Sequence, residues 1–191
     1  MTNTSIRKLF NDRAALWDQS ADYKTDHIRT MLMLSDIRPD AFILDVGCGT
    51  GMLEPNLLRF APKRILAVDF ADKMIEIAKS KIDDERVEFL CEDIFRISPD
   101  FVVADYCFFH SVFPYFSDPE RLIDHISRLI NPGGRLTICH PQSKKSEPGN
   151  GVKLPVLPAQ GFINLLRSHF RLDVIIDNNV MFMVSGCNLK K

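Results

Sequence analysis

Strand-like and helix-like segments alternate along most of this chain, and no other feature of the sequence constrains the fold as strongly. Runs rich in β-branched and aromatic residues are followed by segments whose apolar residues recur three and four apart, a pattern typical of stacked βαβ units. The predicted strands are 41–47, 64–70, 87–92, 104–110 and 134–140. Because crossovers between parallel strands are right-handed, we expect a doubly wound sheet with helices on both faces.

Segments of helical period lie between these strands. They predict helices over 52–60, 71–82 and 118–130. Asp118 and Pro119 supply an N-cap and a first-turn proline for the third helix, and "NPGG" at 131–134 supplies its stop.

The last part of the chain departs from this alternation. Two further predicted strands, 170–179 and 180–188, meet at Asn178 and Asn179 with no room for a crossover helix. They predict a hairpin, so the last strand should run antiparallel. The expected fold is therefore α/β, a Rossmann-like, doubly wound and mostly parallel sheet of seven strands with an antiparallel last strand.

The 191 residues suit one domain. We expect residues 41–191 to form its core and residues 1–40, helical over 6–20 and 24–37, to form a lid over one edge. The segment 140–158, rich in Pro, Gly and Lys, is too long for a plain connector. Its lysines suit an anionic acceptor or simply a solvated loop: Lys144, Lys145 and Lys153.

Charge and composition exclude several classes of function. The formal net charge is −1 and the basic residues are spread along the chain, which disfavours a nucleic-acid partner. No apolar run fits a signal peptide or a membrane span, so we expect a cytoplasmic protein. The five cysteines have no metal-ligand spacing, and Cys91, Cys107 and Cys139 are predicted to be reduced core residues.

The stretch "ILDVGCGTGML" (43–53) concentrates three glycines where a strand gives way to a helix. Such a turn lets a ligand approach the backbone N–H groups, as dinucleotides and S-adenosylmethionine both do. A dinucleotide fingerprint would place its third glycine at position 52, which is Met52. The glycines stand instead at 47, 49 and 51 and follow Asp45, whose carboxylate suits a cationic ligand and repels a pyrophosphate.

This Asp-x-Gly-x-Gly-x-Gly pattern resembles the first motif of the class I S-adenosylmethionine-dependent methyltransferases. "ADYCFFHSVFPYFSD" (104–118) and "LINPGGRLTICHP" (129–141) resemble the motifs around the family's fourth and fifth strands. The opening "FNDRAALWD" resembles the covering helix of ubiquinone and menaquinone biosynthesis methyltransferases, which makes Trp17 a candidate cavity wall or a plain core aromatic.

The resemblance implies a set of cofactor-binding residues. Asp69 would accept the ribose hydroxyls, Phe70 and Met74 would pack against the adenine, and Asp93 with Ile94 would lie near its amine, although Asp93 equally suits a helix cap. The full set is Asp45, Gly47, Cys48, Gly49, Gly51, Asp69, Phe70, Met74, Asp93, Ile94 and His110.

Methyl transfer from a sulfonium needs positioning and exclusion of water, and a base is optional. His110 is the candidate base, because an unperturbed imidazole titrates near neutrality, and it suits a cavity wall equally well. Tyr115 and Phe113 are candidates for the acceptor pocket, whereas packing is favoured for His140.

The predicted function is methyl transfer from S-adenosyl-L-methionine to a small-molecule acceptor, because little of the chain lies outside the core. Two alternatives stay open, an NAD-dependent oxidoreductase and a non-catalytic protein that binds S-adenosylmethionine. A nucleic-acid methyltransferase ranks lower in the absence of a basic stripe.

Overall fold

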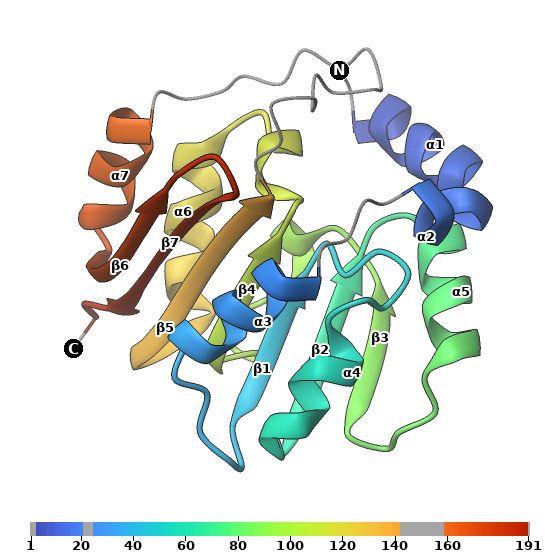
Figure 1. The fold of residues 1–191 in the computed structure, drawn as a ribbon, viewed down its shortest axis with the longest axis horizontal. Helices are drawn as coiled ribbons and strands as arrows, with labels where there is room; N and C mark the ends of the chain where they lie inside the picture. The colour runs from blue at the N-terminus through green and yellow to red at the C-terminus, as the bar shows by residue number, and fades with distance from the viewer. Residues whose placement is uncertain (1–2, 21–24, 142–158, 191) are drawn as a thin grey trace.

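The computed structural model describes residues 3–20, 25–141 and 159–190. Its seven strands form one sheet in the order β3-β2-β1-β4-β5-β7-β6, in which β7 alone runs antiparallel to the other six strands (Figure 1). The strands are β1 (Phe42–Val46), β2 (Arg64–Asp69), β3 (Val87–Cys91), β4 (Ala104–His110), β5 (Ile130–Pro141), β6 (Phe170–Asp177) and β7 (Met181–Asn188). The predicted fold class and the antiparallel terminal hairpin are confirmed.

Helices cover both faces of the sheet. α3 (Thr25–Leu34), α4 (Glu54–Leu57) and α5 (Asp72–Lys81) pack on one face, and α6 (Pro119–Arg128) and α7 (Ala159–Arg167) pack on the other. Strand residues alternate between the two faces. Ile43 belongs to the apolar cluster between the sheet and α3, α4 and α5, and its neighbour Leu44 belongs to the cluster between the sheet and α6 and α7. Burial of both faces explains why the inner strands are almost wholly apolar.

Two local predictions need correction. The "NPGG" segment ends no helix; α6 stops at Arg128 and residues 131–134 bulge within β5, where Asn131 donates to the Asp105 carboxylate at 2.9 Å. Cys91 is exposed, because it ends an edge strand, whereas Cys107 and Cys139 are buried as predicted.

The N-terminal helices α1 (Asn3–Arg13) and α2 (Trp17–Ser20), joined by a 3₁₀ turn, pack beside α5 (Figure 1). The carboxylate of Asp72 in α5 accepts hydrogen bonds from Arg7 at 3.0 Å and from Asn11 at 2.8 Å. The ring of Phe10 contacts three other aromatic rings, which belong to Trp17, Phe70 and Tyr115. This segment is therefore attached to the core by charged contacts and one aromatic cluster.

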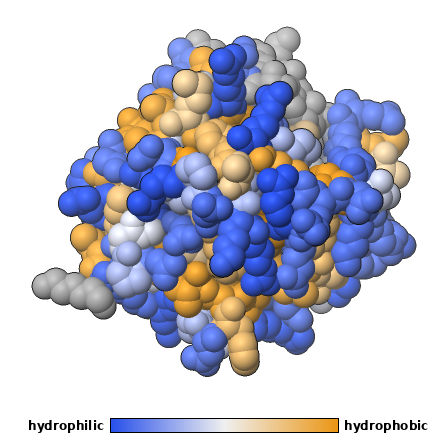
Figure 2. Space-filling model, turned by 90° about the horizontal axis from the view of Figure 1, so that it is seen from below, coloured by the Kyte–Doolittle hydropathy of each residue, from blue (hydrophilic) through white to orange (hydrophobic). Residues whose placement is uncertain are grey.

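The end of the molecule that carries the amino ends of the parallel strands is largely hydrophilic, with apolar residues interspersed (Figure 2). No helix among the described residues is long and apolar enough to cross a membrane. Within the same residues, no cluster of His, Cys, Asp and Glu side chains suits a metal ion. The predicted loop lysines at 144, 145 and 153 lie outside the described residues.

Asn188 gives a test of how the hairpin is attached to the core. Its buried amide nitrogen donates to the carbonyl oxygens of Ser127 and Ile130, both at 2.8 Å. We expect Asn188→Ala to lower the free energy of unfolding by about 2 kcal/mol, because two buried carbonyls lose their donor. Urea denaturation measures this loss. The exposed Asn164→Ala should change stability little, and equal losses in both variants would contradict the assignment.

Candidate active site

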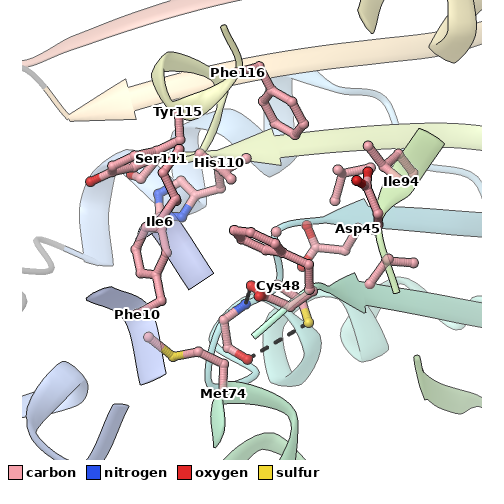
Figure 3. Close-up of a pocket in the computed structure, with 18 of the residues that line it drawn as sticks. Ile6, Phe10, Asp45, Cys48, Met74, Ile94, His110, Ser111, Tyr115 and Phe116 are labelled. Carbon is pink, nitrogen blue, oxygen red and sulfur yellow. Dashed lines mark hydrogen bonds between the residues drawn. The ribbon is translucent and has the colours of Figure 1, made fainter. Parts of the chain in front are cut away.

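A cavity of about 360 Å³ lies at the carboxyl ends of β1, β2, β3 and β4 (Figure 3). In open α/β sheets, ligands bind at this edge, at the point where the strand order reverses, here between β1 and β4. The volume is that of a small-molecule site. N-terminal residues also line it, namely Ile6, Phe10 and Trp17.

The glycine turn after β1 forms the floor of this cavity. The amides of Gly47 and Cys48 donate to the carbonyl oxygen of Val68 in β2, at 2.7 and 3.1 Å. At Gly47, where φ is +72°, an added Cβ would lie 2.3 Å from a methyl of Val112. At Gly49, where φ is +56°, the nearest atom to an added Cβ would be the Trp17 indole nitrogen at 3.9 Å, so this position opens toward the cavity.

The third glycine of the turn, Gly51, is required by packing against a helix and not by the cavity. Gly51 does not line the cavity, unlike the other ten residues predicted to bind cofactor. Its φ is +79°, and an added Cβ would lie 2.9 Å from the Ile82 side chain and 3.2 Å from Ala78. Glycine at this position is therefore explained by the close approach of α5.

Asp69 connects the end of β2 to the glycine turn. Its carboxylate accepts hydrogen bonds from the Gly49 amide at 3.0 Å and from the Ala71 amide at 2.8 Å. Burial raises the pKa of Asp69 to about 6. Phe70 and Met74 follow it along the cavity wall.

Asp93 has both of the roles weighed from the sequence. Its carboxylate accepts a hydrogen bond from the Phe95 amide at 3.1 Å and so caps a short 3₁₀ helix, and Asp93 and Ile94 also line the cavity. The guanidinium of Arg121, which the sequence did not single out, lies 4.3 Å from the centre of the Phe95 ring at the same wall.

His110 lies at the carboxyl end of β4 and lines the cavity (Figure 3). Its Nε2 is 3.0 Å from Nε2 of His27 in α3, a partner that the sequence did not reveal. Burial, together with His27 and His140, lowers the pKa of His110 to about 3. The imidazole is therefore neutral at physiological pH, and its basicity is far below the value expected for a free histidine.

The neighbours of His110 divide between the cavity and the core. Tyr115 lines the cavity, but Phe113 does not, because it is buried against Phe109 and Phe162. His140 stacks near the Phe182 ring, outside the cavity lining, and burial lowers its pKa to about 4.

Ser111 is a strained residue at the cavity wall. Its φ is +61°, a left-handed conformation that side chains disfavour, and its buried hydroxyl has no hydrogen-bond partner among the described residues. Strain of this kind concentrates at functional sites.

Two buried carboxyl groups lie beneath the glycine turn. Asp45 is the next-to-last residue of β1 and lines the cavity, and Glu54 begins α4; both residues are buried. Asp45 Oδ2 and both Glu54 carboxyl oxygens lack a hydrogen-bond partner among the described residues. Burial, and secondarily Glu54, raises the pKa of Asp45 well above its usual range, and burial raises the pKa of Glu54 to about 7.

Asp18 in α2 joins the N-terminal segment to the glycine turn. Its carboxylate accepts hydrogen bonds from the Thr50 hydroxyl at 2.5 Å and from Lys81 of α5 at 2.8 Å. These bonds hold the adjacent Trp17 beside Gly49.

Comparison with known proteins agrees with this geometry. A family model described as "Methyltransferase domain" matches residues 44–138. A malonyl-[acyl-carrier protein] O-methyltransferase of Priestia megaterium is 31% identical over 135 residues, which are 69% of this chain and 49% of that protein. A ubiquinone biosynthesis O-methyltransferase of Coxiella burnetii is 27% identical over 127 residues, 63% of this chain and 54% of that protein.

Solved structures show the same architecture. The N-methyltransferase NodS of Bradyrhizobium japonicum, solved with S-adenosyl-L-homocysteine, superposes with a TM-score of 0.76 at 16% identity and covers 98% of both chains. The chain belongs to the class I S-adenosylmethionine-dependent methyltransferase superfamily. It spans about half the length of the curated members that it matches.

Ser111 offers a test of backbone strain in this member of the superfamily. Ser111→Gly and Ser111→Ala both remove the hydroxyl and differ only in the Cβ. We expect the glycine variant to be more stable than the alanine variant by about 1 kcal/mol, because only the alanine variant retains the left-handed penalty. Urea denaturation measures the difference. At Ser168, whose φ is not positive, the alanine variant should be at least as stable as the glycine variant. If the alanine variant were also the more stable one at Ser111, the backbone there would store no strain.

Proposed function

We propose that this chain transfers a methyl group from S-adenosyl-L-methionine to an oxygen atom of a small-molecule acceptor. One observation carries the proposal: Asp45 lines the cavity, and its buried Oδ2 has no hydrogen-bond partner in the part of the chain that the structure describes. A buried acid of this kind fits a ligand that carries an ammonium group.

The remaining residues fit the rest of that cofactor. The carboxylate of Asp69 suits the ribose hydroxyls, and Phe70, Met74 and Ile94 offer apolar walls for the adenine. Because Gly49 has no side chain and no close neighbour on that side, a ligand can approach the backbone of the turn there. When bound, the cofactor would supply a methyl carbon for in-line attack by an acceptor nucleophile, with the neutral thioether of S-adenosylhomocysteine as the leaving group.

The contribution of the protein is then mainly positioning and exclusion of water. Phe10 and Trp17 line the side of the cavity formed by the N-terminal segment, and Asp18 holds that segment to the turn. We propose that the part of residues 1–40 that precedes α3 acts as the lid of a single domain, whereas α3 packs on the sheet together with the core 41–191.

The acceptor end lies at β4, where His110, Ser111 and Tyr115 line the cavity. A neutral imidazole and two hydroxyls are hydrogen-bonding groups, and an imidazole with a pKa of about 3 is a weak base. This set suits an acceptor oxygen that is already ionised, such as a carboxylate or an acidic phenol. The two curated relatives are both named O-methyltransferases, which supports an oxygen atom as the methyl acceptor.

The two alternatives predict different ligands. NAD binding is disfavoured by Met52 at the third glycine position and by the acids beneath the turn, which repel a pyrophosphate. A non-catalytic binding protein would hold S-adenosylmethionine but turn over no acceptor.

Trp17 reports on the cavity, because it is the only tryptophan of the chain and lies beside Gly49. We expect S-adenosylmethionine and S-adenosylhomocysteine, but not NAD, to change its fluorescence on binding. Gly49→Val and Asp69→Ala should each weaken this binding at least about 100-fold, because one fills the opening and the other removes the ribose acceptor.

Matched controls separate these effects from loss of fold. Gly133→Val introduces a side chain at a similar positive φ with open space around it, and Asp124→Ala removes an exposed carboxylate. Both should bind as the wild type does. Binding of NAD alone, or of S-adenosylmethionine with equal affinity in Gly49→Val, would overturn the proposed function.

The pH dependence of turnover tests the role of His110. Because its pKa is lowered to about 3, His110 stays neutral down to about pH 4, so kcat at saturating cofactor should not fall by its protonation between about pH 8 and pH 5. The measurement is release of S-adenosylhomocysteine with an acceptor found by screening carboxylates and phenols.

A base with an ordinary histidine pKa would instead lose activity tenfold per pH unit below about pH 6.5. We expect His110→Asn to lower kcat about tenfold, the value of one hydrogen bond, and His169→Asn to leave it unchanged. A loss of more than about 1,000-fold in His110→Asn would show that His110 is an essential base.

A further inference from the structure

The sequence does not single out Glu54, yet this side chain is completely buried beside the acid that faces the cavity. Glu54 follows the glycine turn at the first position of α4. Three of the four carboxyl oxygens of Asp45 and Glu54 have no hydrogen-bond partner among the described residues. Buried charges without partners are costly, so this pair needs a proton or a cation.

The groups around the pair are mostly acidic or neutral. Asp69 of β2 adds a third carboxyl that acts on Asp45, and the buried thiols of Cys48 and Cys107 lie near Asp45 from the turn and from β4. Lys81 of α5 is the cation that acts on Glu54, and it is already hydrogen-bonded to Asp18. The surroundings therefore leave the pair with an excess of negative charge.

Two carboxyl groups that interact in a dry site do not both ionise near neutrality. An ionised carboxylate has no proton to donate. A hydrogen bond between Asp45 and Glu54 therefore requires one proton that the two carboxyl groups share. The pair then carries a single negative charge in the free protein. The raised pKa values of both groups agree with this state.

We propose that Glu54 is a cofactor-positioning residue, which shares one proton with Asp45 in the free protein and loses that proton when the ammonium group of the cofactor binds at Asp45. This inference rests on the proposed function for the identity of the ligand. The balance is one ammonium gained at the pair and one proton released to the buffer. The ammonium thus replaces a proton as the counter-charge of two carboxylates.

Cofactor affinity consequently depends on pH in a defined direction. Below the pKa of about 7 that burial gives Glu54, binding must expel a proton, so affinity rises as pH rises. The limiting slope is tenfold per pH unit for one proton released, and it flattens above about pH 7.

Calorimetry measures this proton directly. S-adenosylhomocysteine is titrated at about pH 6.5 in buffers of different ionisation enthalpy, and the slope of the apparent binding enthalpy gives the number of protons released. We expect about 0.5 to 1 proton for the wild type. Glu54→Gln should release clearly fewer protons, because the amide donates to an Asp45 that is already ionised and the smaller contribution of Asp69 remains.

Two controls isolate the pair. Glu76→Gln, which alters an exposed helix carboxylate, should release as many protons as the wild type. 5′-Methylthioadenosine carries the ribose but no ammonium, so it should release at most the proton fraction of about 0.25 that Asp69, with a pKa of about 6, still holds at this pH. Release of as many protons with this ligand as with S-adenosylhomocysteine would identify Asp69 as the source and would overturn the proposal, as would equal release in wild type and Glu54→Gln.

The outcomes also separate this proposal from the proposed function. Wild-type protein that binds S-adenosylhomocysteine without releasing a proton would overturn the role of Glu54 alone. Folded wild-type protein that does not bind it would overturn the proposed function as well. If Glu54→Gln does not fold, the wild-type buffer series and the neutral ligand still decide between release and no release.

Discussion

The two hydrogen bonds that the Asp69 carboxylate accepts determine the shape of the whole site. One comes from Gly49 in the turn after β1 and the other from Ala71 at the start of α5, so a single side chain fixes three segments at the end of β2. The turn is further held by the amides of Gly47 and Cys48 on the Val68 carbonyl. The floor of the cavity is thus a backbone turn whose amides are held by acceptors at the end of β2. The walls of the cavity lie where the neighbouring strands end.

The sequence predicts the sheet well, because the strands that carry it are short apolar runs with clear turn residues between them. Asp118 caps α6 as predicted, with its carboxylate accepting from the Arg121 amide. The sequence does not predict the helix α7: its apolar residues Phe162, Ile163 and Leu166 have helical spacing, but they stand between the predicted loop segment 140–158 and a predicted strand. "NPGG" was misassigned because a glycine-rich stop and a strand bulge have the same composition.

Site residues can be predicted from the sequence where they stand at or next to the end of a predicted strand. The sequence predicts Asp69 and His110 because each ends a strand at the ligand-binding edge, and it predicts Asp45 because this acid precedes the glycine turn. Glu54, Ser111 and His27 were not, because their importance depends on burial, backbone strain and a partner distant in the sequence. The same limit separates Tyr115 from Phe113, since identity alone does not tell which aromatic side chain faces a cavity and which faces the core.

The attachment of the N-terminal segment divides the molecule into two parts that respond differently to salt. The ion pairs of Arg7 with Asp72 and of Lys81 with Asp18 are between about one third and one half exposed, and such pairs weaken as ionic strength rises. The apolar clusters of the sheet are not weakened in this way. The contacts that hold the N-terminal wall of the cavity in place therefore loosen in concentrated salt, whereas the apolar packing of the sheet that shapes the cavity does not.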